Sequence, residues 1–222
     1  MSLGLQITNT ANIIPHVKYD ARAGRLFRVD RVQDASGAYQ RTTVDITTPA
    51  PKFIMDLGGI QVGWLHFSER GPDFHLVRLG QTLPAKPSDQ HRQGFLVHLY
   101  AARLLGGVRQ FSSNAKTVVA AMDALHSEYE RAPEAARGLV PVVTLAGTVA
   151  VQTASAAGQT TSYAPVFQIE KWVERPRELD EAAEAAKSAA PAATAAPSAQ
   201  HVPPPAPRPV TPEPVPADAP EF

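Results

Sequence analysis

The stretch "GFLVHLYAARLLGGVRQFSS" (residues 94–113) decides the fold. Its first eight residues are rich in aromatic and large apolar side chains, which is typical of a strand. Gly106 and Gly107 then mark a turn. The residues that follow, 106–113, predict a second strand. The stretch therefore indicates a domain built mainly of β-strands.

Short runs of the same kind, separated by turn residues, occur on both sides of this stretch. The runs predict strands at 25–32, 39–47, twice within 51–68, and at 139–153 and 164–173. The first two strands are expected to form a hairpin around the turn "DASG" (34–37). Gly58-Gly59 predicts a bend or bulge between the two strands of 51–68.

One segment has the period of a helix instead. It begins after Ser113 or Asn114, either of which is a good N-cap, and Pro133 marks its end. Its apolar stripe recurs at i, i+4, i+7 and i+11 and consists of Val118, Met122, Leu125 and Tyr129. About eight short strands and one helix predict a mainly β fold. We interpret it as an OB-like β-barrel with one packed helix, although other small β folds share this count.

The composition changes after Leu179. Residues 180–222 contain 14 Ala and 11 Pro, and only 181–188 have the pattern of a short helix. Pro fixes the backbone and removes hydrogen-bond donors, so this segment is expected to be a disordered, extended tail. We therefore divide the chain into a folded domain at 1–179 and a linker with an acidic tip at 180–222.

The bulk composition excludes several classes of protein. The 222 residues contain no Cys, which excludes disulfides and thiolate metal sites. The N-terminus lacks the pattern of a signal peptide, and no stretch approaches about 20 apolar residues. We expect a cytoplasmic protein that does not enter the membrane.

No catalytic signature is present. The sequence lacks GxSxG, GxxxxGK[ST], HExxH and CxxC, and its acids are scattered. His91 and His98 are seven residues apart and need not share a strand face, so they are interpreted as ordinary histidines. We expect no catalytic residue, no metal and no cofactor, although an enzyme without a known signature stays an alternative.

Binding of a single nucleic-acid strand has more support, because it needs basic side chains for phosphates and aromatic faces for bases. Residues 1–179 carry 19 Lys and Arg against 15 Asp and Glu, whereas 180–222 carry 2 against 6. The candidate stacking residues are Phe27, Trp64, Phe67, Phe95, Tyr100 and Phe111. The candidate phosphate-binding residues are Arg25, Arg28, Arg31, Lys52, Arg92 and Arg109. A long irregular segment after Ser68, rich in Gly, Pro and basic residues, is expected to be a loop beside them.

The last residues, "DAPEF" (218–222), place an acid, an aromatic ring and a carboxylate at the end of a long linker. A partner can take the ring in a pocket and pair with the charges. The residues that would do so are Asp218, Pro220, Glu221 and Phe222. Together with the body segments "FIMDLGGIQVGWLHF", "RQGFLVHLYA" and "GGVRQFSSNA", this arrangement resembles the single-stranded DNA-binding proteins of bacteria and bacteriophages.

The resemblance implies an OB-fold body, binding of single-stranded DNA without catalysis, and recruitment of replication and recombination proteins by the tip. It also implies that residues 1–179 are the single-stranded DNA-binding domain, located in the host cytoplasm if the protein is phage-encoded. Self-association into a homo-oligomer is compatible with it. The main alternative is a virion structural or assembly protein that uses the Pro/Ala-rich segment as a spacer. A carbohydrate-active β domain is the third interpretation, and it requires a cluster of acids in a pocket.

Overall fold

The computed structural model describes residues 15–33, 39–69, 71–155 and 158–189. The chain divides into two units, residues 1–190 and residues 191–222. The second unit lies outside the described residues. The four residues proposed for the tip also lie there. Of the tail that was predicted to be disordered, residues 190–222 lie outside the described residues, whereas residues 180–189 are described and are helical.

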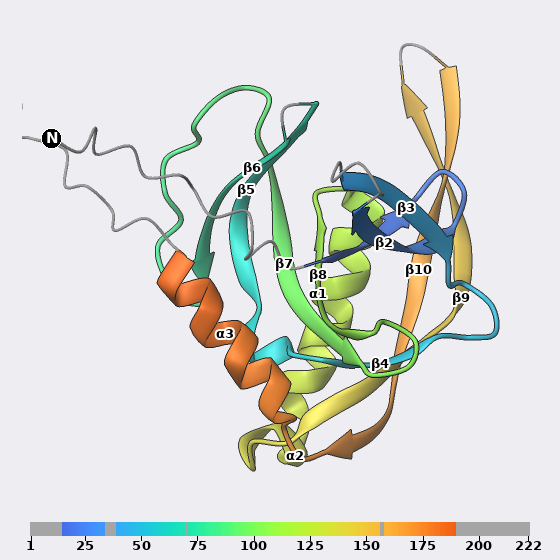
Figure 1. The fold of residues 1–222 in the computed structure, drawn as a ribbon. Helices are drawn as coiled ribbons and strands as arrows, with labels where there is room; N and C mark the ends of the chain where they lie inside the picture. Colours follow the sequence, from blue (N-terminus) through green and yellow to red (C-terminus); the bar gives the residue numbers. More distant parts are fainter. Residues whose placement is uncertain (1–14, 34–38, 70, 156–157, 190–222) are drawn as a thin grey trace, which may run out of the picture. The chain divides into compact units, whose positions relative to one another are not determined.

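The described residues form a ten-stranded sheet with a few helices (Figure 1). Its first five strands are β1 (His16–Asp20), β2 (Arg25–Gln33), β3 (Tyr39–Asp45), β4 (Lys52–Met55) and β5 (Gln61–Ser68). The other five are β6 (Gly71–Arg78), β7 (Arg92–Ala101), β8 (Gly107–Ser113), β9 (Val140–Ser155) and β10 (Gly158–Val173). The prediction of a mainly β fold is confirmed.

The sheet is mixed and open. Its strands follow the order β10-β9-β4-β7-β8-β1-β2-β3, and β5 and β6 branch from β7. The pairing of β1 with β8 is parallel and the other pairings are antiparallel. The sheet curls until Tyr163 on β10 donates its N–H to the Ala21 carbonyl, at 2.6 Å, beside the turn after β1. No ladder joins β10 to β2 or β3 within the described residues, so the expected barrel is not closed.

The predicted strands are present, but the sequence interpretation omitted two others. The segment after Ser68 was expected to be irregular, and this prediction is wrong for Gly71–Arg78. These residues form β6, which pairs with β5 from Ser68↔Gly71 to Gln61↔Arg78. His16–Asp20 form β1, between β2 and β8. Gly58-Gly59 belong to a short 3-10 helix, η2 (Leu57–Gly59), which the Asp56 side chain caps.

Helix α1 (Lys116–Arg131) packs against the core with the predicted stripe, and Val118, Met122 and Leu125 are all buried. Tyr129, the fourth member, stacks on Trp172 of β10 with ring centroids 5.7 Å apart. Neither Ser113 nor Asn114 caps α1. Ala115 is its N-cap, and the Ser113 hydroxyl accepts a bond from the Ala115 N–H. Pro133 begins a separate short helix, α2 (Pro133–Ala136).

Helix α3 (Arg177–Ala189) crosses the boundary that was predicted at 179/180. It lies in front of the sheet (Figure 1) and contacts β7 and β8. Leu179 is fully buried, and the Tyr100 hydroxyl of β7 donates to Glu178 at 2.9 Å. Just before α3, Arg175 makes two hydrogen bonds to the buried Asp56, at 2.6 and 2.7 Å. These contacts make α3 part of the first unit.

Candidate nucleic-acid interface

The outward face of β1, β2 and β3 carries the best-placed of the predicted residues. Side chains alternate along a strand, so every second residue of β2 points to this face. These residues are Arg25, Phe27, Val29 and Arg31. Phe27 lies directly opposite Lys18 of β1, so the two side chains share the face. Phe27 is half-buried, Arg31 is exposed and Val29 between them is buried.

Several cations gather around His16 at the far end of this face. Arg41 of β3 lies opposite Arg31, and its guanidinium is 3.2 Å from His16 Nε2. Burial lowers the pKa of His16, and Arg41, Arg31 and Lys18 lower it further. No carboxylate of the described residues lies within 4.0 Å of Lys18, Arg31 or Arg41. We call Lys18, Phe27, Arg31 and Arg41 the β1–β3 face.

Arg25 is placed differently from Arg31 although both belong to β2. Its guanidinium pairs with Asp45 of β3 at 2.6 Å. Hydrogen bonds from Thr47, followed by the bond from Arg25, lower the pKa of Asp45 to about 2. Arg25 is exposed at the edge of the β1–β3 face, with its charge balanced by this acid.

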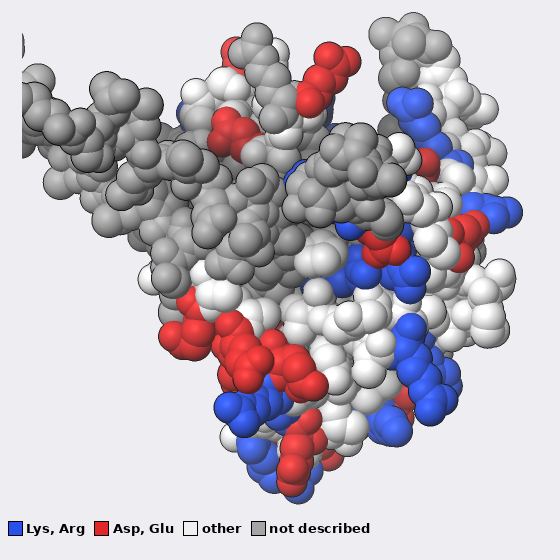
Figure 2. Space-filling model, in the orientation of Figure 1, with Lys and Arg blue, Asp and Glu red and all other residues white. Residues whose placement is uncertain are grey.

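Acidic and basic side chains are unevenly distributed on the surface, although Arg175 and Arg177 pair with acids of α3. Figure 2 shows Lys and Arg gathered on the side of β2 and β3, with a few acids among them. Asp and Glu follow α3 on the other side of the same view. Helix α3 contributes Glu178, Asp180, Glu181 and Glu184 to that acidic side. A polyanion would therefore be attracted to the β1–β3 face and repelled by α3.

Two predicted phosphate-binding residues are held by Asp30 and by backbone carbonyls, and one of them, Arg109, is also buried. Arg109 is buried, pairs with Asp30 at 2.6 Å and donates to the carbonyls of Leu105 and Val29. Arg28 binds the same Asp30 at 3.0 Å and the Leu104 carbonyl. Assigning Arg109 to phosphate binding is wrong, because its donors already tie β8 to β2 and to the turn before β8.

Two predicted stacking residues are also in the core. Phe95 and Phe111 are buried and meet edge to face, with ring centroids 5.4 Å apart. Phe111 in turn packs against Phe167 of β10. Neither ring has a free face for a base, so their assignment to stacking is corrected to core packing.

A second set of predicted residues lies at the free end of the β5–β6 hairpin. Phe67 is half exposed and meets Phe74 of β6 edge to face at 5.2 Å. Arg92 is exposed and is paired in register with Leu65, the residue two before Phe67. Trp64 points to the opposite side of β5, where its indole N–H donates to the Pro84 carbonyl at 2.8 Å.

The remaining two predicted residues have acidic partners. Lys52 of β4 is exposed but pairs with Glu170 of β10 at 2.7 Å. Tyr100 is bound to Glu178 of α3, and that hydrogen bond raises its pKa. A base that stacked on Tyr100 would have to approach acidic α3.

Sequence reasoning missed a group of histidines. Asp73 and His75 lie two residues apart on β6, and His66 of β5 lies directly opposite Asp73. His91, just before β7, completes the group, whereas His98 is on the next strand and does not join it. The alternation of Asp73 and His75 would have indicated the cluster only if 71–78 had been recognised as a strand.

An apolar pocket lies between β5, β7 and α1. Its lining includes Ile60, Leu79, Leu83 and Met122, and Asp123 is its one carboxylate. A carbohydrate-active enzyme with paired catalytic acids requires at least two carboxylates around its substrate. This pocket does not present that arrangement.

Comparisons with protein-family models, with curated proteins and with solved structures found no match for this chain. The resemblance to single-stranded DNA-binding proteins therefore stays a prediction. Within the described residues, no helix has the length and apolar character needed to cross a membrane.

Proposed function

We propose that this protein binds single-stranded DNA without catalysing a reaction, and that the β1–β3 face is its principal contact surface. The observation that carries the proposal is the pairing of Phe27 with Lys18 beside Arg31 and Arg41, three cations without an acidic partner among the described residues. A flat aromatic ring next to cations that have no carboxylate partner in the described part of the chain offers a stacking surface for a base and counter-charges for the adjoining phosphates.

The end of the β5–β6 hairpin, with Phe67 and Arg92, is proposed as a second contact for the same strand. Both side chains are exposed, and the hairpin branches from the main order of the sheet. We also propose that the curled sheet is OB-like, since OB folds bind single strands on a strand face with projecting loops.

The first test uses fluorescence anisotropy with labelled oligo-dT. Phe27→Ala should weaken binding by about 1–3 kcal/mol, the range measured for one base-stacking residue. The double variant Arg31→Ala/Arg41→Ala should reduce the slope of log affinity against log salt by about 1.4, because each of the two arginines that no longer neutralises a phosphate accounts for about 0.7.

The matched control is Arg137→Ala/Arg177→Ala, which removes two exposed arginines that already pair with acids three or four residues away in the sequence. This control should leave both affinity and slope unchanged. An unchanged slope in Arg31→Ala/Arg41→Ala, or an equal fall in the control, would contradict the assignment of the β1–β3 face.

We propose that the C-terminal tip recruits replication or recombination proteins. Because α3 belongs to the first unit, the chain should be shortened after Ala190 rather than after Leu179. The shortened protein should bind oligo-dT at least as tightly as the full chain and should no longer bind its protein partners. Loss of DNA binding on this truncation would refute the separation of roles.

A further inference from the structure

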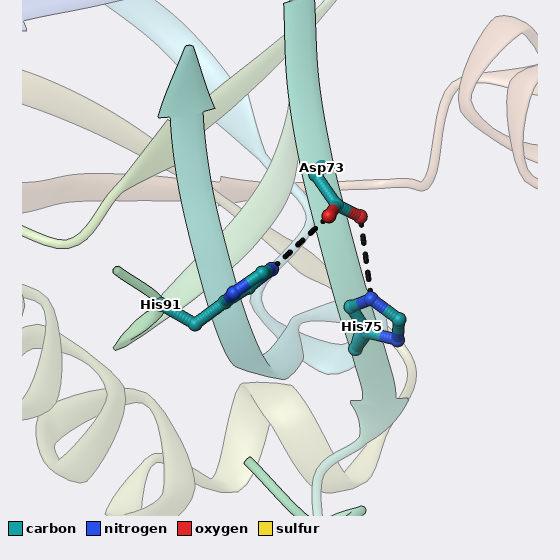
Figure 3. A group of neighbouring side chains, drawn as sticks. All are labelled: Asp73, His75 and His91. Atoms are coloured by element: carbon teal, nitrogen blue, oxygen red, sulfur yellow. Dashed lines mark ion pairs between the residues drawn. The ribbon is translucent and has the colours of Figure 1, made fainter. Parts of the chain in front are cut away.

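We propose that Asp73, His75 and His91 bind one divalent first-row transition metal ion, for which zinc is the test ion. Their ligand atoms all lie within 4.8 Å of one another. Figure 3 shows the two imidazoles directed at the two oxygens of a single carboxylate. His75 Nε2 is 3.2 Å from Asp73 Oδ1, and His91 Nε2 is 3.3 Å from Asp73 Oδ2.

These spacings match those of a coordination sphere. Bonds of 2.0–2.1 Å to nitrogen and oxygen in a tetrahedral site put neighbouring ligand atoms about 3.3 Å apart. The two spacings to Asp73 have this length, and the three ligand atoms lie within 4.8 Å of one another, so an ion between them requires the side chains to draw closer together. Two imidazoles and one carboxylate are a donor set used by divalent transition metals.

The strongest indication is the burial of the His91 side chain, which is independent of the spacing of the three ligands. This side chain is 5% exposed, and its buried Nε2 atom makes no hydrogen bond among the described residues, although Asp73 Oδ2 lies 3.3 Å from it. A buried polar atom left without a partner is costly, and such an atom calls for an explanation such as a missing ion or water. Nε2 is the atom directed at Asp73 and His75.

The other nitrogen of His91 is oriented for this role. Nδ1 lies 2.8 Å from Ser88 Oγ, and Ser88 Oγ also accepts the Gln90 N–H. A metal on Nε2 requires the proton to be on Nδ1, and the serine oxygen can accept it there. Outer hydrogen bonds of this kind hold metal-binding imidazoles in place. Ser88 is thus a positioning residue for the site.

The site would add a tie between two segments that Trp64 and Pro84 already join by a hydrogen bond. Asp73 and His75 belong to the β5–β6 hairpin, and His91 ends the segment 79–91 that leads into β7. His66 lies beside the group, with its ring centroid 5.4 Å from that of His91, but it is not one of the three clustered ligands. We assign the fourth position to solvent.

The test uses the full chain, without an affinity tag, after treatment with EDTA and desalting. Zinc alone is titrated in competition with a chromophoric chelator, and cobalt is added separately to record the visible absorption of a tetrahedral site. The wild type should take up one equivalent of zinc, and zinc should raise its melting temperature.

His75→Ala and Asp73→Asn should each weaken zinc binding at least about tenfold, and both side chains are exposed enough for the fold to tolerate the change. Ser88→Ala should weaken it about tenfold while keeping one equivalent. His126→Ala, on α1, and His66→Ala are the controls and should bind as the wild type does.

The proposal would be overturned if the wild type took up no equivalent of zinc, or if His75→Ala and Asp73→Asn bound it as tightly as the wild type. A loss in His66→Ala as large as that in His75→Ala would overturn the three-ligand assignment. Oligo-dT binding is measured on the same variants. Intact DNA binding in His75→Ala would separate this site from the proposed function.

Discussion

Replacing Arg175 by Met should destabilise the first unit strongly, although no sequence motif marks this residue. Its guanidinium holds the buried carboxylate of Asp56 by two short hydrogen bonds, and those bonds raise the pKa of Arg175 further above its already high value. Asp56 is 2% exposed, so the variant leaves a charge inside the protein without its counter-charge.

The size of the effect follows from this burial. Removing one partner of a buried ion pair costs about 3–5 kcal/mol. The Arg175 side chain is 30% exposed, and Asp56 keeps its bond from the Gly59 N–H, so the lower end of the range is expected. A loss of about 3 kcal/mol corresponds to a fall in melting temperature of about 6–12 °C for a domain of this size.

The assay is urea denaturation followed by tryptophan fluorescence, since Trp172 stacks on Tyr129 where β10 packs against α1. The matched control is Arg177→Met, two residues further along the chain. Arg177 pairs with Glu181 in solvent, and loss of such a pair costs less than about 1 kcal/mol. A destabilisation below about 1 kcal/mol in Arg175→Met, or equal destabilisation of the two variants, would refute the reasoning.

Three further predictions concern the core and two titrating groups. Phe111→Ala should cost about 3–5 kcal/mol in urea denaturation, because it leaves a cavity in the core, and a cost near zero would contradict its burial. An NMR titration should find the pKa of Asp45 at about 2, so the stability it contributes is present above about pH 4 and disappears as the pH falls towards 2. Thr47→Val should raise that pKa, and an unchanged value would contradict the assigned cause. Burial lowers the pKa of His98, so its contribution to stability is present above pH 6.5 and disappears as the pH falls below that value. His98→Leu should therefore be destabilised less than the wild type when the pH is lowered from about 7.5 to about 5.5, and equal destabilisation would refute this assignment.

Much of the fold could be predicted because turn residues separate its strands. Gly106-Gly107 between β7 and β8 and the apolar stripe of α1 both have strong local signals. Strand β6 was missed because Gly71, Pro72 and Asp73 at its start favour turns over strands. Its pairing with β5 overrides that local preference. The histidine cluster was missed with it, since a strand that is not recognised has no faces to compare.

The buried aromatics could not be separated from the exposed ones for a different reason. Alternation identifies a solvent face only when one side of a strand is exposed. β7 is buried on both sides, with Phe95 towards the core and Leu96 and His98 on the other face, so its sequence is apolar almost throughout. β2 also has buried residues on both sides, Leu26 on one and Val29 on the other, so its alternation does not by itself show that Phe27 is half-buried and Arg31 exposed.

The most direct test of the proposed function compares labelled oligo-dT with a matched duplex in fluorescence anisotropy across a salt series. We predict preferential binding of the single strand, with log affinity falling linearly as log salt rises, at about 0.7 for each phosphate that the protein neutralises. No binding of the single strand at low salt, by both the full chain and the chain shortened after Ala190, would contradict the proposal. If the same protein formed a large oligomer, that result would favour an assembly role instead.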